Sequence, residues 1–404
     1  MALLPVSAVV DELLAALQSA AQVMLHAPTG AGKSTWLPLE ILRSGGLPGR
    51  VVMLEPRRLA AKNVALRLAE QLGEGPGQTV GYRMRNESRC GPATRLEVVT
   101  EGILTRQLQQ DPALDGVSLV ILDEFHERSL QADLALALLL DVQRGLRDDL
   151  KVLIMSATLD DRRRGAATAA AAGRFAAAVF ARRGGNQPGA GAAWRAAGGG
   201  GDAVPLYGAL PLEAQQRAIR PAPEGRRKVV LATNIAETSL TIEGIRLVVD
   251  SGLERVAEFD PRSGLDRLTT RRISQASMAQ RAGRAGRLSP GVCLHLFSQD
   301  QGERAPEHHA PEITYADLTP FWLELLQWGV SESAQLSWLD APPAPALAAA
   351  VNTLTALGAL DARQRLTPAG RAMAGNGCDP RLGACCTTPA RTPTPLLPPR
   401  CWRP

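Results

Sequence analysis

Short apolar runs of strand length alternate with longer helical patterns throughout residues 1–160. Helical periodicity, clearest at 57–72 and 130–147, fills the gaps between five strand-like runs at 23–26, 51–54, 96–100, 118–122 and 151–155. Strands that alternate with helices in this way form βαβ units, whose strands lie parallel in one sheet that helices cover. The pattern therefore predicts one α/β domain over residues 1–160.

The next ordinary-looking region, residues 203–300, returns to the same alternation, with strands expected at 228–232, 246–250 and 292–297. It predicts a second α/β domain that is small for its class. Residues 317–382 are helical and apolar, most clearly at 321–328 and 347–360. We expect Trp322, Trp328 and Trp338 to be core residues of this region rather than platforms for base stacking.

Two stretches differ in composition from the rest of the chain. Ala, Gly and Arg occupy 32 of the 42 positions in 161–202, which carries a net charge of +5, and 383–404 contains six Pro and carries +3. Such segments bury too little apolar surface to offset their conformational entropy, so we expect no strand of useful length in 161–202. The whole chain is +5 but the remaining residues sum to −3, so net charge alone is no argument for nucleic-acid binding.

Composition excludes other classes of protein. No run of about 18 uncharged apolar residues occurs, so no membrane span is expected. The first 21 residues contain Asp11 and Glu12 and lack a basic segment, unlike a signal peptide. The six Cys show no metal-ligand spacing, which indicates a reducing, cytoplasmic location rather than a disulfide framework.

The segment Ala27-Pro-Thr-Gly-Ala-Gly-Lys-Ser34 directly follows the first strand, although Ala27 stands where a P-loop expects Gly. Its glycines permit a tight turn that points backbone N–H groups at a phosphate, its lysine can reach the outer phosphates, and its serine hydroxyl is a ligand for Mg²⁺. The alternative is a chance glycine-rich loop, which the position after a strand disfavours. We predict an ATP site formed by Thr29, Gly30, Ala31, Gly32, Lys33, Ser34 and Thr35.

Two adjacent carboxylates, Asp123 and Glu124, follow the apolar strand 118–122. Open α/β sheets bind ligands at the carboxyl ends of their strands. We predict that Asp123, with Ser34, holds the metal that bridges the β- and γ-phosphates, and that Glu124 orients and deprotonates the attacking water. The alternative is an acidic loop that caps the following helix.

These motifs resemble one family. Asp123-Glu-Phe-His126 resembles motif II of superfamily 2 helicases of the DEAH class, in the bacterial HrpB type. Motifs Ia, Ib, III, V and VI are similar, in family order, to Glu55-Pro-Arg-Arg-Leu-Ala-Ala61, Thr100-Glu-Gly-Ile-Leu104, Ser156-Ala-Thr158, Leu231-Ala-Thr-Asn-Ile-Ala-Glu-Thr-Ser-Leu-Thr-Ile242 and Gln280-Arg-Ala-Gly-Arg-Ala-Gly-Arg287. The resemblance covers 1–160 and 203–382. It implies two RecA-like P-loop NTPase domains, with parallel sheets flanked by helices, and then a small helical, winged-helix-like region.

The resemblance also assigns roles in catalysis. It implies that Gln280 positions the water, and that Arg284 and Arg287 approach the γ-phosphate from the second domain, a task that suits planar guanidinium groups. His126, Ser156 and Thr158 are expected to couple hydrolysis to domain movement. The alternatives are a solvated basic turn for the arginines and a structural role for the histidine.

A further set of residues is predicted to contact nucleic acid. Arg57 and Arg58 begin a helix, where a cation is unfavourable unless an anion is bound nearby. Thr100, Thr233 and Asn234 are short polar residues at strand ends, and the resemblance implies that all five hold a single strand by its backbone. The alternatives are a surface pair for the arginines and strand-end caps for the threonines. The expected partner is single-stranded or partly duplex RNA, with DNA left open, and no oligomeric state is predicted.

The implied activity is an ATP-dependent helicase that uses ATP and Mg²⁺ and moves 3′ to 5′ along a strand. The resemblance fails in 161–202, where no motif IV is found, and again in 383–404. Our hypothesis is a translation-frame error in a GC-rich gene, which sequencing the DNA would test. We then expect normal ATP contacts in the first domain but weak or absent unwinding. Two alternatives stay open: a nucleic-acid-binding ATPase without unwinding, and an inactive frame-disrupted product.

Overall fold

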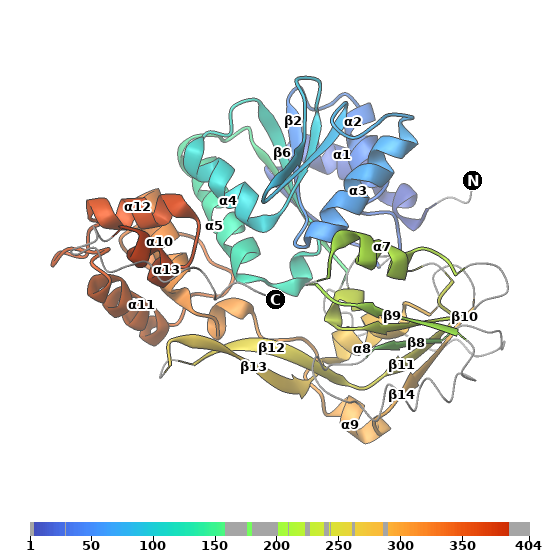
Figure 1. Cartoon of the computed structure of the whole chain (residues 1–404). Helices are drawn as coiled ribbons and strands as arrows, with labels where there is room; N and C mark the ends of the chain where they lie inside the picture. The colour runs from blue at the N-terminus through green and yellow to red at the C-terminus, as the bar shows by residue number, and fades with distance from the viewer. Residues whose placement is uncertain are drawn as a thin grey trace. The chain divides into compact units, whose positions relative to one another are not determined.

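The computed structural model describes residues 4–28, 30–157, 176–179, 201–208, 210–222, 227–237, 242, 244–260, 263–285 and 290–387. The chain divides into two compact units, Met1–Glu312 and Ile313–Pro404. The first unit holds two sheets, both made mainly of parallel strands, and a two-stranded antiparallel hairpin (Figure 1).

The first sheet and its helices, here called the first lobe, contain seven strands. Their order is β1 (Gln22–His26), β7 (Lys151–Ser156), β6 (Val117–Leu122), β2 (Arg50–Leu54), β5 (Leu96–Val99), β3 (Val80–Met84) and β4 (Glu87–Arg89). All neighbours pair parallel except β3 and β4, which pair antiparallel. The five strands that the sequence predicts are all present. Strands β3 and β4 were missed because their sequences are short and partly polar.

Helices cover both faces of the first sheet (Figure 1). The helices α1 (Val10–Ser19), α2 (Leu37–Arg43) and α3 (Arg58–Gln71) share one apolar cluster with Val51 and Met53 of β2. Successive side chains of a strand point to opposite faces, so Val52 and Leu54 face the side of α4 (Glu101–Gln110) and α5 (Leu130–Gly145). Burial on both faces explains why β2 is a continuous apolar run rather than an alternating one.

The second sheet and its helices, here called the second lobe, contain five strands. Their order is β14 (Val292–His295), β11 (Leu247–Asp250), β8 (Ala176–Val179), β10 (Arg227–Ala232) and β9 (Gly201–Leu206), and every pair is parallel. Helix α7 (Leu212–Ile219) packs on β9. Leu206, Val230 and Val248 are buried in its core, and Leu59 of α3 joins the same apolar cluster. The two lobes therefore share apolar contact.

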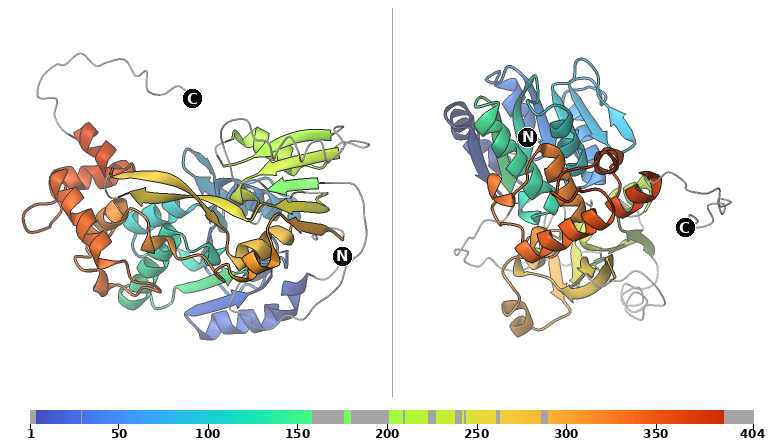
Figure 2. Two further views of the ribbon diagram at one scale, coloured as in Figure 1. Left: turned by 90° about the horizontal axis from the view of Figure 1, so that it is seen from below. Right: turned by 90° about the vertical axis from the view of Figure 1, so that its left-hand side faces the viewer.

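The expectation that residues 161–202 contain no strand of useful length was wrong, because the four-residue strand Ala176–Val179 lies inside a sheet. Strand β8 lies at the centre of the second sheet, where it pairs with β10 on one side and β11 on the other, and β9 begins at Gly201 (Figure 2). Neighbours on both sides supply all the backbone hydrogen bonds of a central strand, so position in a sheet can override a composition that is poor in strand formers. The remaining positions of 161–200 lie outside the described residues.

A long antiparallel hairpin follows β11 in the chain, and the sequence pattern did not predict it. Its strands are β12 (Leu253–Asp260) and β13 (Leu265–Arg272), seen as the yellow ribbon in Figure 2. Both strands are rich in charged residues, and Leu265 and Leu268 are mostly exposed, so no apolar alternation marks them. Helix α8 (Gln275–Ala282) comes next, capped by the Ser274 side chain, and α9 (Gln299–Glu303) follows β14.

The second unit is helical, as the sequence predicts. It contains α10 (Leu318–Trp328), α11 (Ala344–Ala356), α12 (Pro368–Asn376) and α13 (Pro380–Thr387). Trp322 is buried, which confirms a core role for it. Trp328 and Trp338 are half-buried, and the Trp338 ring packs at 5.5 Å from that of Phe321. Helix α13 extends into the segment 383–404, of which residues 388–404 lie outside the described residues.

The described part of the chain contains no helix long and apolar enough to cross a membrane. Four cysteines, Cys90, Cys293, Cys378 and Cys385, are free thiols.

Candidate nucleotide and nucleic-acid site

The loop between β1 and α2 has the backbone shape that the glycine pattern predicts. Gly30 and Gly32 have φ of +84° and +95°, a left-handed conformation that favours glycine. A side chain at Gly32 would also meet the Leu4 Cδ1 atom at 2.9 Å, whereas the space beside Gly30 is open. Lys33 is buried, and its Nζ donates to the Ala27 carbonyl at 3.0 Å. The loop is thus folded around its own lysine, while Thr29 lies outside the described residues.

Asp123 follows β6 and lies beside the loop. It is fully buried, and its Oδ1 accepts the Glu124 backbone N–H at 2.8 Å. Burial and the neighbouring Glu124 raise the pKa of Asp123 to about 6, against the opposing influence of Lys33 and Ser34. Its Oδ2 is buried without a hydrogen-bond partner among the described residues. An orphaned carboxylate oxygen next to a buried hydroxyl is a suitable pair of hard ligands for Mg²⁺.

A metal at this place would need oxygens from a bound nucleotide. In the described part of the chain, no group of three or more His, Cys, Asp or Glu side chains is arranged to hold a metal ion. Mg²⁺ is commonly bound by one or two protein ligands together with substrate phosphates. The arrangement of Ser34 and Asp123 fits that mode of binding and does not fit a metal held by protein alone.

The catalytic carboxylate expected at Glu124 sits on strained backbone. Glu124 has φ of +49° at the start of the short 3₁₀-helix η2 (Phe125–Glu127), and Arg128 after it has φ of +48°. Left-handed conformations at non-glycine residues cost about 1–3 kcal/mol each and cluster at functional sites. The Glu124 side chain is only 5% exposed. Its placement is thus set by the turn rather than by local preference.

His126 joins the two lobes at this carboxylate. Its Nε2 lies 3.4 Å from Glu124 Oε2 and 2.7 Å from the side-chain nitrogen of Gln280 on α8. Its Nδ1 accepts the Ala157 backbone N–H at 3.2 Å. Burial lowers the pKa of His126, although Glu124 and Glu127 oppose the shift. The ring is therefore neutral near pH 7, and its contacts bring together residues from motifs II, III and VI.

The residues predicted for coupling after β7 are only partly described. Ser156 ends β7 and is buried with a polar partner. Ala157 supplies the backbone N–H that holds His126. Thr158 lies outside the described residues, so its role remains a prediction.

Helix α8 and the turn after it carry the predicted arginines. Arg284 is buried, and its guanidinium donates to the Glu237 backbone carbonyl. Arg287 lies outside the described residues. Sequence reasoning gave no role to Arg281, yet it is more deeply buried than Arg284 and makes ion pairs with Glu237 and Asp250. The first basic position of the motif could have been flagged by its adjacency to Gln280.

The two arginines at the start of α3 have different surroundings. The Arg57 guanidinium is half-buried and paired with Glu127 Oε2 at 3.1 Å. Arg58 is exposed, and its contact is with the Arg85 backbone carbonyl at 3.3 Å. The structure thus separates a pair that the sequence treated alike, because the Glu127 carboxylate, directly after motif II, already neutralises Arg57.

The remaining predicted contacts lie at strand ends. Thr100 follows β5 and precedes α4, and its side chain makes no cap hydrogen bond to the helix. Thr233 follows β10, and Asn234 begins the 3₁₀-helix η3 (Asn234–Glu237). All three side chains are partly exposed. The carboxyl ends of β5 and β10 therefore present polar groups, as expected for positions that hold a strand by its backbone.

Glu55 is a buried residue that the sequence left without a role. It follows β2, which is paired with β6, and neither of its carboxylate oxygens has a hydrogen-bond partner among the described residues. Burial, followed by the charges of Asp123 and Glu124, raises its pKa well above the usual range. Three carboxyl groups so close together in a buried place cannot all be ionised. The sequence signal that could have identified Glu55 is its position directly after a buried strand.

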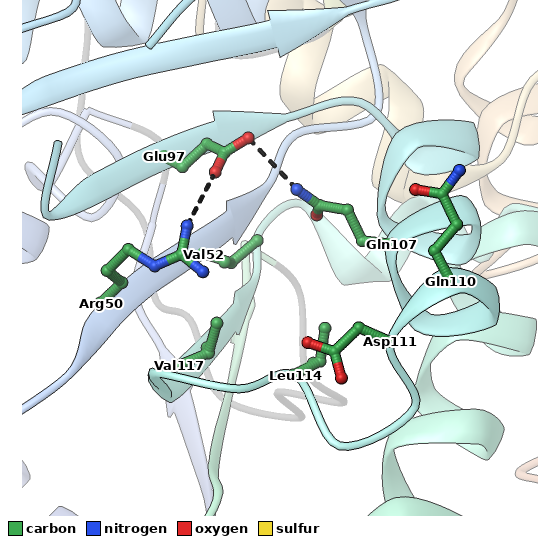
Figure 3. A pocket seen from close by; sticks show the side chains of 8 residues that line it. All are labelled: Arg50, Val52, Glu97, Gln107, Gln110, Asp111, Leu114 and Val117. Atoms are coloured by element: carbon green, nitrogen blue, oxygen red, sulfur yellow. Dashed lines mark hydrogen bonds and ion pairs between the residues drawn. The ribbon is translucent and has the colours of Figure 1, made fainter. Parts of the chain in front are cut away.

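A small cavity at the other edge of the first sheet belongs to a different region. It has a volume of about 120 Å³ and lies at the amino ends of β2 and β6, where Arg50 and Val117 begin their strands (Figure 3). The Glu97 carboxylate in it is held by Arg83 at 2.7 Å and by Gln107 at 3.2 Å. These contacts satisfy the buried charge, and we assign the cavity no ligand.

Family models match most of the chain. The DEAD/DEAH box helicase model matches residues 7–164, the helicase conserved C-terminal domain model matches 194–289, and the winged-helix model of the helicase associated domain (HA2) matches 350–375. The first two matches correspond to the two lobes with their parallel sheets.

Close relatives agree with these matches. ATP-dependent RNA helicase HrpB of Escherichia coli (strain K12) is 58% identical over 95% of this chain and 52% of that protein. Two crystal structures, titled E. coli DExH-box NTPase HrpB and Escherichia coli DEAH/RHA helicase HrpB, match with TM-scores of 0.79 and 0.83, at 54% and 55% identity. Each match covers 96% of this chain. It covers 53% of the first solved chain and 54% of the second. The chain spans about half the length of these relatives. The chain therefore carries one region that matches the DEAD/DEAH box helicase model and one that matches the helicase C-terminal model, and it is similar to HrpB over about half of that protein's length.

Proposed function

We propose that this protein is an ATP-dependent RNA helicase, which couples ATP hydrolysis to movement along a single RNA strand and to separation of a duplex. The observation that carries the proposal is the contact between His126 and Gln280, 2.7 Å long, which links the candidate catalytic carboxylate of the first lobe to α8 of the second. The relative from E. coli, named an ATP-dependent RNA helicase, supports the same activity.

The nucleotide would occupy the loop 29–35. Lys33 would exchange the Ala27 carbonyl for the outer phosphates, because an ammonium held by one neutral acceptor gains more from a phosphate. Ser34 and Asp123 would hold Mg²⁺, which supplies charge neutralisation between the β- and γ-phosphates. Thr29, Gly30, Ala31, Gly32 and Thr35 would complete the cradle with backbone N–H groups and a hydroxyl.

Glu124 would take the proton of the attacking water. The neutral His126 ring carries its proton on Nε2, because Nδ1 accepts the Ala157 N–H. That proton faces both Glu124 and Gln280, so the histidine orients the base and the glutamine together. Arg284 and Arg287 would stabilise the charge that develops on the transferred phosphoryl group, after Arg284 leaves the Glu237 carbonyl. Ser156 and Thr158 would transmit the closure of the lobes.

RNA would lie against the carboxyl ends of the strands, held by Arg58, Thr100, Thr233 and Asn234. Arg57, which is paired with Glu127, would support this surface rather than contact RNA directly. These groups can bind phosphates and sugars without reading bases, which suits an enzyme that moves along any sequence. A preference for RNA over DNA is part of the proposal and rests on the relative's name alone.

A strand-displacement assay tests the proposal, with RNA-stimulated ATP hydrolysis measured beside it. We expect the unmodified chain to separate a duplex with a single-stranded tail and to lose hydrolysis and separation together on Lys33→Ala. Duplex separation that persists in Lys33→Ala, or hydrolysis that RNA does not stimulate, would contradict the proposal.

One observation favours a second candidate, a nucleic-acid-binding ATPase that does not unwind. Val292, Leu294 and Leu296, in and after the edge strand β14, are 46%, 50% and 61% exposed. The matches of the first two family models are separated by residues 165–193. Exposed apolar side chains make few buried contacts, which would lower the rigidity of this edge of the second lobe. RNA-stimulated hydrolysis without strand separation would select this candidate.

A further inference from the structure

Arg281 is an arginine of α8 that faces the interior of the second lobe. It is 1% exposed. Its Nε and one terminal nitrogen lie 2.6 and 2.5 Å from Glu237 Oε1, and its other terminal nitrogen lies 2.8 Å from Asp250 Oδ1 and 3.1 Å from the Leu253 carbonyl. All three guanidinium nitrogens are therefore engaged inside the lobe, and Arg281 is not available to a nucleotide.

The partners of Arg281 connect it to the candidate nucleic-acid contacts. Glu237 is the last residue of η3, which begins at Asn234 directly after Thr233. Asp250 ends β11, the next strand but one from β10 in the sheet. The arginine therefore ties α8 both to the segment that would hold RNA and to the sheet itself.

Glu237 holds the second arginine of the motif as well. Its side chain pairs with Arg281, and its backbone carbonyl accepts from the Arg284 guanidinium. A displacement of η3 is therefore passed to two points of the same segment. The planar guanidinium binds its partners with a fixed geometry, so a shift of Glu237 would move Arg281 more directly than it would move a flexible ammonium.

Gln280 lies next to Arg281 on the helix and points elsewhere. Adjacent helical residues are about 100° apart around the axis. The Arg281 side chain thus enters the second lobe, while Gln280 contacts His126 of the first lobe. A shift of α8 that follows Glu237 must change the contact between Gln280 and His126.

We propose that Glu237 and Arg281 are positioning residues, through which RNA bound at Thr233 and Asn234 sets the position of Gln280 and Arg284. The inference rests on the proposed function, because it requires RNA to bind at η3. Neither residue touches the reacting atoms. Their buried ion pair fixes a geometry, and its loss leaves an unpaired charge that loosens α8 from η3.

The test uses the full chain with a fluorescently labelled single-stranded polyuridine RNA. RNA affinity is measured by anisotropy, and amide hydrogen exchange of α8 and of η3 is measured with and without RNA. We expect RNA to slow exchange in both segments of the unmodified chain. Glu237→Gln should bind RNA within about threefold of the unmodified affinity and keep the RNA-dependent protection of η3, but lose that of α8.

Two further variants separate positioning from folding. Arg281→Lys keeps the charge but cannot bridge Glu237 and Asp250, so the same loss of α8 protection is expected. Lys228→Gln is the control, because Lys228 is also a buried charged residue of the second lobe, and its Nζ donates to the Ala218 carbonyl at 2.8 Å, which joins β10 to α7 rather than to α8. It should retain RNA-dependent protection of α8.

Each other outcome has a defined meaning. Protection of α8 that survives in Glu237→Gln and Arg281→Lys overturns the inference and leaves the proposed function in place. Equal loss in Lys228→Gln also overturns it, because general loosening of the lobe would then be the cause. Absence of RNA binding by the unmodified chain overturns the proposed function, and the inference with it.

Discussion

The Nε2 atom of His126 lies 2.7 Å from the side-chain nitrogen assigned in Gln280, a residue 154 positions later in the chain. The neutral ring must donate from Nε2, because its Nδ1 accepts the Ala157 N–H. A donor needs an acceptor, so the amide oxygen of Gln280 is the atom that faces the ring, an assignment that amide orientation permits. The contact is then a hydrogen bond between the lobes, donated by His126 Nε2 to the Gln280 amide oxygen.

Removal of this hydrogen bond should slow hydrolysis without weakening nucleotide binding. We expect Gln280→Ala to lower kcat for ATP about 10- to 100-fold while KM changes by less than about threefold, because positioning acts in the transition state. His126→Ala should behave alike. The double variant should be no worse than the poorer single one, since the two residues act as a unit.

Steady-state ATP hydrolysis with saturating RNA checks this prediction. Gln299→Ala is a suitable control, because Gln299 lies on α9 and bonds only to Glu303 in the same helix among the described contacts. Additive effects of the two single variants would show that His126 and Gln280 work independently.

Substitutions in the phosphate loop and at the catalytic carboxylate should affect ATP binding and ATP hydrolysis differently. Lys33→Ala should weaken ATP binding and hydrolysis together, because Lys33 is the buried cation of the loop. Glu124→Gln should keep ATP binding within about threefold but reduce kcat by about 10²- to 10⁴-fold, through loss of the base. Titration with a fluorescent ATP analogue and single-turnover hydrolysis distinguish the two. Equal loss of binding in both variants would argue against a catalytic role for Glu124.

Arg57 and Arg58 should respond differently to substitution. Arg58→Gln should weaken RNA binding and reduce the slope of log affinity against log salt by about 0.7, the value for one phosphate contact on a single strand. Arg57→Gln should instead destabilise the first lobe by about 1 kcal/mol, because it leaves the Glu127 carboxylate without its ion pair. Anisotropy at several salt concentrations and urea unfolding measure the two effects. A larger change of salt slope for Arg57→Gln would reverse the assignment.

The pKa of Glu101 makes stability depend on pH. Burial raises this pKa from 4.5 to about 7, although a hydrogen bond from Ser129 opposes the shift. A carboxyl whose pKa is higher in the folded state binds more protons there, so stability is lost as pH rises from about 4.5 to about 7. The loss is on the order of 3 kcal/mol, from about 1.4 kcal/mol per pKa unit.

Glu101→Gln should remove this dependence and stabilise the chain at pH 8, because the neutral amide has no charge to bury. Urea unfolding at pH 5 and pH 8 measures the effect. Glu70→Gln serves as the control, because Glu70 is exposed on α3 and its ion pair with Arg67 is a surface one. A pH dependence that survives in Glu101→Gln would place its origin in another group.

Much of the first lobe is predictable from sequence, because local patterns there agree with the tertiary structure. Strand β2 is a continuous apolar run that the sheet buries on both faces, and Gly32 stands where the loop requires a left-handed backbone. The second lobe was harder. The hairpin strands carry charge along both faces, and β8 has the composition of a segment that forms no structure alone.

The candidate site shows the same division. Lys33, Asp123 and Glu124 are recognisable because a loop or strand end displays them in a short segment. Glu55 and Glu237 were not recognised as site residues. The position of Glu55 after a buried strand was a signal, but the sequence does not show that it lies beside Asp123 or that Glu237 pairs with Arg281. Burial and charge pairing depend on which segments meet in space.

The sequence by itself determined the class of fold, the phosphate loop and the order of the motifs, because each follows from residues close together in the chain. Only the tertiary structure decided that β8 is a central strand, that Arg57 is neutralised while Arg58 is exposed, and that His126 meets Gln280. The physical reason is that hydrogen bonds and ion pairs between distant segments have no local signature. They exist only once the backbone has brought their partners within about 3 Å.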